Sequence, residues 1–91
     1  MDVDSDRLRT DIETTAEFGA IATDAGRGRT VLTGTDANRR AREYLVDRLE
    51  AAALDVRVDE VGTVVGRWCP PGADADAAPV AAGSHLDSVP E

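Results

Sequence analysis

Apolar residues recur at three- and four-residue steps in two stretches of the chain, the spacing that is typical of amphipathic helices. The first stretch covers about residues 5–20, and Asp4 or Ser5 can cap its start. The second covers about residues 36–53, and its remaining faces are charged. We therefore predict two helices. Their apolar positions are Leu8, Ile12 and Ala16 in the first, and Ala41, Tyr44, Leu45, Leu49 and Ala52 or Ala53 in the second.

Alternating apolar and polar residues predict two strands, at about residues 55–61 and 63–68. Only Gly62 separates them, so the pattern allows either a tight turn or one long bent strand. Residues 79–84 are apolar at successive positions, which favours a third strand buried on both faces. This third strand is expected to deliver His85 to the edge of the sheet.

The segments between these elements are rich in residues that break regular structure. Residues 23–35 carry three glycines and no helical stripe, which predicts a loop. Residues 69–78 contain two consecutive prolines and an Ala/Asp tract, which indicates a linker. We find no internal repeat and no second domain boundary. The pattern predicts one α/β domain over residues 1–91, with two helices flanking a small sheet.

The charge balance excludes several kinds of chemistry. The 91 residues carry a net charge of −8, and all ten basic residues are arginine. A Walker-type phosphate loop and a lysine Schiff base both need a lysine, so neither can be built here. Nucleic acid is not an expected partner for so acidic a chain. The acidity suggests a halophilic protein adapted to a salt-rich cytoplasm, and biased base composition is the alternative explanation.

The sequence has neither an apolar run that spans a membrane nor a basic signal peptide, and these two features predict the location of the protein. No apolar run approaches the ~18 residues that span a bilayer, so no membrane association is expected. The first residues are acidic where a signal peptide would be basic, which makes the cytoplasm the expected compartment. Cys69 is the single cysteine, so an internal disulfide is impossible.

The candidate chemistry lies in the segment Gly83–Pro90, which holds the single histidine of the chain. His85 and Asp87 are two residues apart, so in an extended segment they face the same side. Imidazole is the commonest metal ligand, and a carboxylate can fix its tautomer. Structural alternatives stay open, because a lone His-x-Asp is common and Asp87 can instead cap a turn. A nucleophilic pair of Cys69 with His85 is disfavoured, since Cys69 precedes two prolines and no acidic third member can be assigned.

Three blocks of the sequence together resemble one enzyme family. They are Leu32–Leu45, Leu49–Gly62 and Gly83–Pro90. Their order and spacing are similar to those of the hydantoinase/carbamoylase type of di-zinc amidases. This group includes N-carbamoyl-L-amino-acid hydrolases and allantoate amidohydrolases, within the aminoacylase and zinc carboxypeptidase superfamily. The resemblance extends from about Asp6 onward, and its most specific block is the last.

The resemblance implies a role for each residue of the His-x-Asp motif. It matches His85 to the family's first zinc ligand, and Asp87 to the aspartate that supports and orients that ligand. It also implies two divalent metal ions, zinc by preference. The implied activity is hydrolysis of a linear amide, carbamoyl or ureido C–N bond by metal-activated hydroxide, with an N-carbamoyl or ureido compound as the small-molecule substrate.

The family's later blocks are not found in this sequence. They would supply a bridging aspartate, a glutamate pair, two further histidines and the domain that forms the dimer. We therefore expect the N-terminal part of a catalytic domain, inactive alone and without the family-type homodimer. The alternative is a non-catalytic interaction fragment that pairs with a separately encoded C-terminal half.

Two positions depart from the family pattern. Thr63 stands where the family usually has asparagine after glycine, which removes any polar contact that the asparagine makes. Ala53 stands where many relatives have a helix-ending glycine, which is expected to weaken the C-terminal cap of the second helix.

Overall fold

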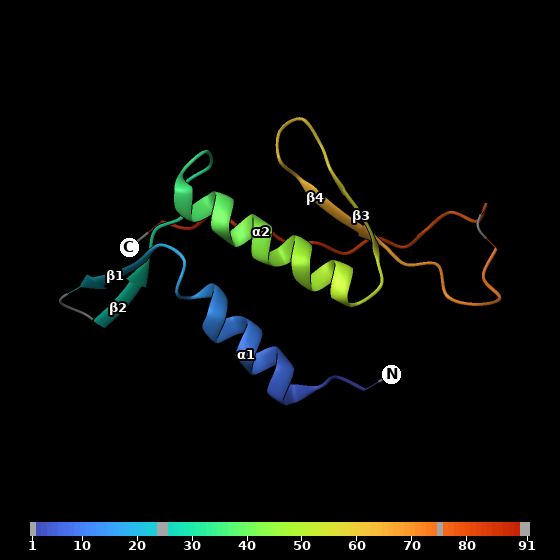
Figure 1. Cartoon of the computed structure of the whole chain (residues 1–91), viewed down its shortest axis with the longest axis horizontal. Coiled ribbons are helices and arrows are strands. Elements are labelled where there is room, and N and C mark those ends of the chain that lie inside the picture. Colours follow the sequence, from blue (N-terminus) through green and yellow to red (C-terminus); the bar gives the residue numbers. More distant parts are fainter. Residues whose placement is uncertain (1, 24–25, 75, 90–91) are drawn as a thin grey trace. The chain divides into compact units, whose positions relative to one another are not determined.

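The computed structural model describes residues 2–23, 26–74 and 76–89 (Figure 1). Neither of the helices in these residues is both long and apolar enough to cross a membrane. The elements in chain order are α1 (Ser5–Thr15), β1 (Ala20–Thr23), β2 (Gly26–Arg29), α2 (Asp36–Ala51), β3 (Asp55–Val58) and β4 (Val64–Arg67).

The chain divides into two compact units, and the single domain over residues 1–91 stays a prediction. The first contains the residues up to Tyr44 together with the segment from Leu86 onward. The second is Leu45–His85. The boundary falls inside α2, between Tyr44 and Leu45, where helical periodicity continues without a break.

The mixture of helices and strands confirms the predicted α/β class. The strands form two separate two-stranded antiparallel sheets, β1–β2 and β3–β4, where a single small sheet was expected. The first sheet lies partly in residues 23–35, so the prediction of a loop throughout that segment is wrong. Glycine alternates with arginine in β2. The strand therefore lacks the alternation of apolar and polar residues by which strands are recognised in a sequence.

The first helix is shorter than its predicted range of about residues 5–20. It starts after Asp4, whose Oδ1 accepts a hydrogen bond of 3.0 Å from the backbone N–H of Arg7. It ends at Thr15 because the chain turns at Gly19, where φ is +71°. A Cβ at Gly19 would lie 2.0 Å from the backbone oxygen of Thr30, so this turn requires glycine.

Aromatic and polar contacts within the first unit connect α1 and the turn after it to the first half of α2. The hydroxyl of Tyr44 donates a 2.6 Å hydrogen bond to Oδ1 of Asp11. The rings of Phe18 and Tyr44 are tilted, with centroids 5.8 Å apart, and the Arg40 guanidinium lies 5.3 Å from the Phe18 centroid. Such aromatic and cation–π pairs contribute about 0.5–1.5 kcal/mol each.

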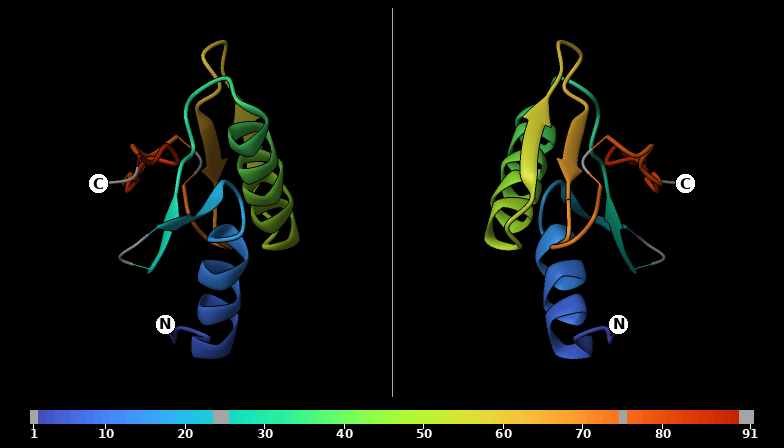
Figure 2. Two further views of the ribbon diagram at one scale, coloured as in Figure 1. Left: turned by 90° about the vertical axis from the view of Figure 1, so that its left-hand side faces the viewer. Right: turned by 90° about the vertical axis from the view of Figure 1, so that its right-hand side faces the viewer.

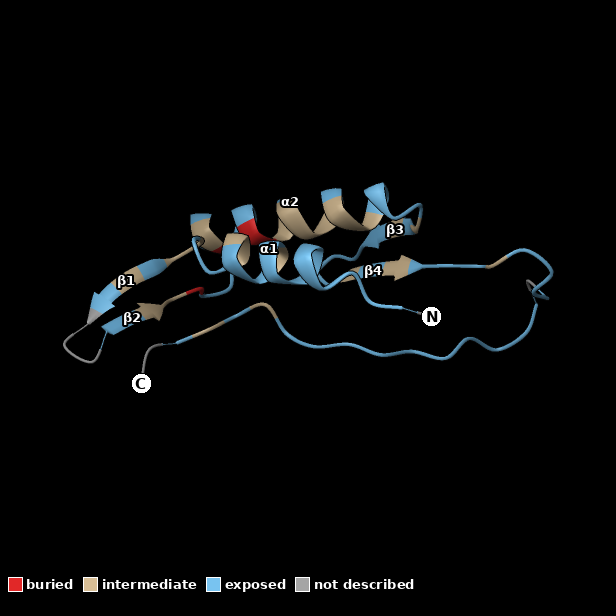
Figure 3. Cartoon of the chain, turned by 90° about the horizontal axis from the view of Figure 1, so that it is seen from below, coloured by how far each residue is buried: buried red, intermediate tan, exposed pale blue. Residues whose placement is uncertain are grey.

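The core of the described residues is small. Val31 is fully buried and Ala41 is 1% exposed, and they are the two buried apolar residues (Figure 3). The apolar stripe of α1 is largely uncovered, since Leu8 is 50% and Ile12 is 59% exposed. Helical periodicity therefore identifies α1 correctly although its apolar face lacks a covering layer.

In the second unit, β3 and β4 form an antiparallel hairpin, which resolves the ambiguity at Gly62 in favour of a tight turn (Figure 2). The Asp59 carboxylate holds the turn, because Oδ1 accepts hydrogen bonds from the backbone N–H groups of Val61 (3.0 Å) and Thr63 (2.9 Å). Gly62 has φ +88°, as such a turn needs. Position 63 thus contributes its backbone to the turn.

The C-terminal end of α2 forms a Schellman motif. The N–H of Leu54 bonds the Leu49 oxygen at 3.1 Å, and the N–H of Ala53 bonds the Glu50 oxygen at 2.9 Å. Ala53 adopts the left-handed conformation with φ 64°. A Cβ at Gly66 of β4 would lie 2.8 Å from the Leu54 side chain and 3.2 Å from that of Leu49. Gly66 therefore leaves the space in which both leucines pack on the hairpin.

The predicted strand at residues 79–84 is absent. These residues have no regular structure and are exposed, and Val80 is 100% exposed. A strand that is apolar on both faces needs a neighbouring strand and a covering layer on each side. Within the described parts of the chain, neither sheet pairs with this segment.

Replacing Ala53 by glycine is expected to stabilise the protein by about 1 kcal/mol, because a non-glycine residue in the left-handed conformation costs roughly 1–2 kcal/mol. The measurement is the free energy of unfolding in urea. Ala51→Gly, at the last helical position of α2, is the matched control and should destabilise the protein instead. Equal changes in the free energy of unfolding from the two substitutions would contradict the strained conformation of Ala53 at the C-terminal cap of α2.

An exposed ion-pair chain supports the first turns of α2. The Arg39 guanidinium lies 2.6 Å from Oδ1 of Asp36 and 2.7 Å from Oε1 of Glu43. The hydrogen bond from Arg39, followed by its positive charge, lowers the pKa of Asp36 below its ordinary value of 3.8. The hydrogen bonds to both carboxylates raise the pKa of Arg39.

Arg39→Gln is expected to raise the pKa of Asp36 toward 3.8. A lowered pKa means that this pair stabilises the fold at pH above 3.8, and that the contribution is lost as the pH falls through the lowered pKa. An NMR titration of the Asp36 carboxyl measures the shift. Arg42→Gln in the same helix is the control and should leave the pKa of Asp36 unchanged. In 1 M salt, Arg39 should lower the pKa of Asp36 less.

Candidate functional site

The predicted site residues lie in the exposed segment that follows the linker. His85 is exposed and is the last residue of the second unit. Asp87 is also exposed and belongs to the first unit. Pro90, the last residue of the predicted motif, is outside the described residues. Neither side chain is enclosed by the residues that the structure describes.

The residue after Asp87 is anchored to the core of the first unit. The backbone N–H of Ser88 bonds the Val31 oxygen at 2.8 Å, and the N–H of Val31 bonds the Ser88 oxygen at 2.7 Å. The Ser88 hydroxyl also donates a hydrogen bond of 3.5 Å to the backbone oxygen of Arg29, the last residue of β2. Because Val31 is fully buried, this pair fixes the backbone next to Asp87 to a core residue of the first unit.

Sequence reasoning missed this anchor. The signal was the pair Val31–Leu32, a short apolar step within a segment otherwise rich in glycine and arginine. An isolated antiparallel bridge involves one residue from each side, so it has no periodicity to detect. Only long-range pairing reveals that residues 31 and 88 belong together.

The described residues do not form a complete metal site. Among them, no group of three or more His, Cys, Asp or Glu side chains is placed to hold a metal ion. A catalytic zinc site uses three protein ligands and an open position for water. His85 supplies one ligand of the preferred type, so the assignment of His85 and Asp87 to a metal centre stays a prediction.

The chain is similar to curated hydrolases over nearly its whole length. It is 39% identical over 85 residues to an N-carbamoyl-L-amino-acid amidohydrolase of Paenarthrobacter aurescens, which covers 93% of this chain and 19% of that protein. It is 34% identical over 88 residues to a ureidoglycolate hydrolase of Oryza sativa subsp. japonica, covering 97% of this chain and 17% of the relative. A Rhizobium meliloti N-carbamoyl-L-amino-acid amidohydrolase is 38% identical over 88 residues, with 97% and 20% covered.

These similarities confirm the predicted resemblance to amidases of the hydantoinase/carbamoylase type. The chain is related in particular to the N-carbamoyl-L-amino-acid amidohydrolases and ureidoglycolate hydrolases, and it spans 17–20% of the length of these three relatives. No family model matches the sequence. No solved structure matches it either.

Ser88→Pro is expected to loosen the anchor beside Asp87, because proline lacks the N–H that bonds the Val31 oxygen. Losing one hydrogen bond of about 1 kcal/mol should speed exchange of the Val31 amide roughly fivefold. Hydrogen exchange followed by NMR measures this rate. Ser84→Pro, in the exposed segment before His85, is the control and should leave the Val31 amide protected.

Proposed function

We propose that this chain forms part of an amidohydrolase that cleaves a linear amide, carbamoyl or ureido C–N bond. The proposal is supported by 34–39% identity to hydrolases whose names specify N-carbamoyl-L-amino acids and ureidoglycolate. Both named substrates are small molecules that carry a carboxylate and a carbamoyl or ureido group. In such a reaction water adds to the carbonyl carbon, the C–N bond breaks, and the nitrogen leaves with a proton.

His85 is the proposed metal ligand, and Asp87 is proposed to orient it. A Zn²⁺ ion, when bound, supplies a Lewis acid that polarises the carbonyl and activates water. The described residues do not complete the ligand set of such an ion. We propose that further ligands come from the part of such an enzyme that the relatives have beyond the matched segment, and that the 91 residues alone are inactive. The anchor at Ser88 then serves to hold the backbone on one side of the motif.

A second proposed role is that of an interaction fragment, which pairs with a separately encoded polypeptide corresponding to the rest of such an enzyme. The small core favours it. Ten large apolar side chains are exposed, against two apolar residues that are buried in the described parts of the chain. The two proposals are compatible, since a paired fragment can contribute His85 to a shared site.

A segment exchange tests the proposed activity. We would replace the matching segment of the Paenarthrobacter aurescens relative with this chain, in one continuous polypeptide, and measure ammonia release from N-carbamoyl amino acids. The chimera should be active. His85→Ala should lower kcat/KM by at least about 100-fold, and Asp87→Ala by about 10- to 100-fold.

Ser84→Ala is the matched control, since it lies beside the motif and carries no assigned role; its kcat/KM should stay within a few-fold of the chimera. A folded chimera without activity would contradict the proposed function. An active chimera that tolerates His85→Ala would contradict the assignment of the ligand. The unmodified 91-residue chain should show neither turnover nor stoichiometric zinc.

A further inference from the structure

The β1–β2 hairpin carries two arginines on one face. Arg27 and Arg29 are two residues apart in β2, so their side chains project from the same side of the strand. The register pairs Arg27 with Ala22 and Arg29 with Ala20. Because alanine is small, the residues across the strands leave space around both guanidinium groups. The hairpin therefore places two neighbouring positive charges beside small neutral side chains.

The two arginines line an open hollow of about 420 Å³ in the first unit. The other residues of its lining are Ala16, Ala20 and Gly28. None of these five residues carries a negative charge, so the charge of the lining is positive. An arginine pair of this kind is suited to an anion, because the guanidinium group has only donors and is always charged.

The Arg29 guanidinium is held in position but is incompletely paired. Its Nε–H donates a 3.0 Å hydrogen bond to the backbone oxygen of Phe18, in the turn after α1. Its Nη2 atom is buried and has no hydrogen-bond partner in the part of the chain that the structure describes. Buried donors in native proteins are satisfied by protein groups, by water or by an ion. A positive charge that is partly removed from water is stabilised most by an anion.

Three carboxylates lie near these arginines in the sequence or in the fold. Glu17 and Asp87 are exposed, and neither lines the hollow; Asp87 already takes part in another interaction. Asp24 lies outside the described residues. Among the residues that the structure describes, no ion pair involves Arg27 or Arg29. The described carboxylates therefore leave the charge of this pair uncompensated.

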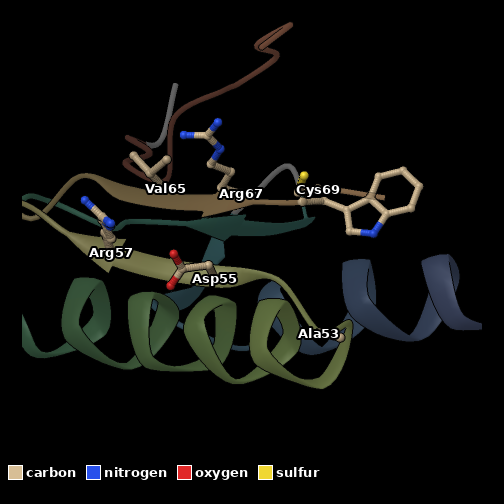
Figure 4. Close-up of a pocket in the computed structure, with 7 residues that line it drawn as sticks. Ala53, Asp55, Arg57, Val65, Arg67 and Cys69 are labelled. Atoms are coloured by element: carbon tan, nitrogen blue, oxygen red, sulfur yellow. The ribbon is translucent and has the colours of Figure 1, made fainter. Parts of the chain in front are cut away.

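The β3–β4 hairpin of the second unit has a larger hollow, of about 690 Å³, with a different balance of charge (Figure 4). Arg57 and Arg67 line it together with a carboxylate, Asp55, which stands across the strands from Arg67. Arg67 also takes part in another interaction. The lining includes Val65 and Trp68, which are 52% and 57% exposed. This hollow is mixed in charge, whereas the hollow of β1–β2 is lined by arginine and small residues.

We propose that Arg27 and Arg29 form a binding site for a small oxyanion, a carboxylate or a phosphate group, in the hollow of the β1–β2 hairpin. A planar guanidinium group matches two oxygens of such an anion with two parallel hydrogen bonds. The bound anion supplies the negative charge that the described carboxylates do not supply. The inference is independent of the proposed function, because it rests on the first hairpin and the turn after α1.

An NMR titration of the 91-residue chain with inorganic phosphate, and separately with acetate, tests the site. Sodium chloride at matched ionic strength is the reference for screening. We expect the backbone amides of Gly28 and Arg29 and the Nε–H of Arg29 to shift in a saturable way with the oxyanions and not with chloride. Arg27→Gln should weaken the Kd at least about tenfold, because it removes a charged hydrogen-bond donor.

Arg9→Gln is the matched control, since Arg9 is exposed in α1 and does not line the hollow, and it should leave the Kd unchanged. Arg29→Lys keeps the charge but loses the paired donors of the guanidinium group, so it should also weaken the Kd. Circular dichroism checks that each variant keeps its fold. Arg27→Gln decides the question if Arg29→Lys unfolds the chain, because Arg27 is exposed.

Three results would each overturn the inference: equal shifts in chloride, no saturation with either oxyanion, or equal weakening by Arg27→Gln and Arg9→Gln. Saturation by one of the two oxyanions alone would support the site and identify the oxyanion that it binds.

Discussion

The structure depends on one constraint, which is that the chain has few large apolar side chains to bury. One Phe, one Tyr and one Trp accompany a hydrophobic content dominated by Ala and Val. The ring of Phe18 packs on that of Tyr44 in α2, and Val31 is the largest fully buried side chain among the described residues. With so few large groups, the first unit relies on directional contacts: the Tyr44–Asp11 hydrogen bond, the cation–π pair and the backbone pair at Val31.

The same shortage explains the importance of glycine. Gly19 allows the backbone of Thr30 to approach where any Cβ would collide, and Gly66 leaves room for Leu49 and Leu54. Close approach of backbone and small residues thus replaces the volume that large side chains would fill. At Ala53 the chain adopts a glycine-like conformation without glycine, so this helix end stores strain that the leucine contacts must offset.

The sequence predicts those helices and strands that are specified by the spacing of apolar residues along the chain. Both helices and the β3–β4 hairpin follow from periodicity, and their ends differ from the predictions where a single residue decides, as at Gly19 and Ala53. The pairing of β1 with β2 was missed because glycines hide the alternation. The strand predicted at residues 79–84 is absent. A segment that is apolar on both faces forms a strand only between neighbouring strands and covering layers, and the described residues do not supply them. The roles that motif recognition assigns to His85 and Asp87 stay predictions, and the bridge at Ser88 leaves only the short apolar step Val31–Leu32 as a trace in the sequence.

The absent strand and the exposed hairpin face share one physical explanation. A segment that is apolar on both sides, and a hairpin that carries Val65 and Trp68 outward, are both sequences suited to an interior. Neither is enclosed within the described residues, although the chain retains 34–39% identity to hydrolases roughly five times its length. The contacts among the described residues therefore order the parts of the chain that have local or backbone support, and they leave these two apolar segments uncovered. His85 lies between the first of these segments and Ser88, whose backbone pairs with that of Val31, so the described residues anchor the chain on the C-terminal side of the motif.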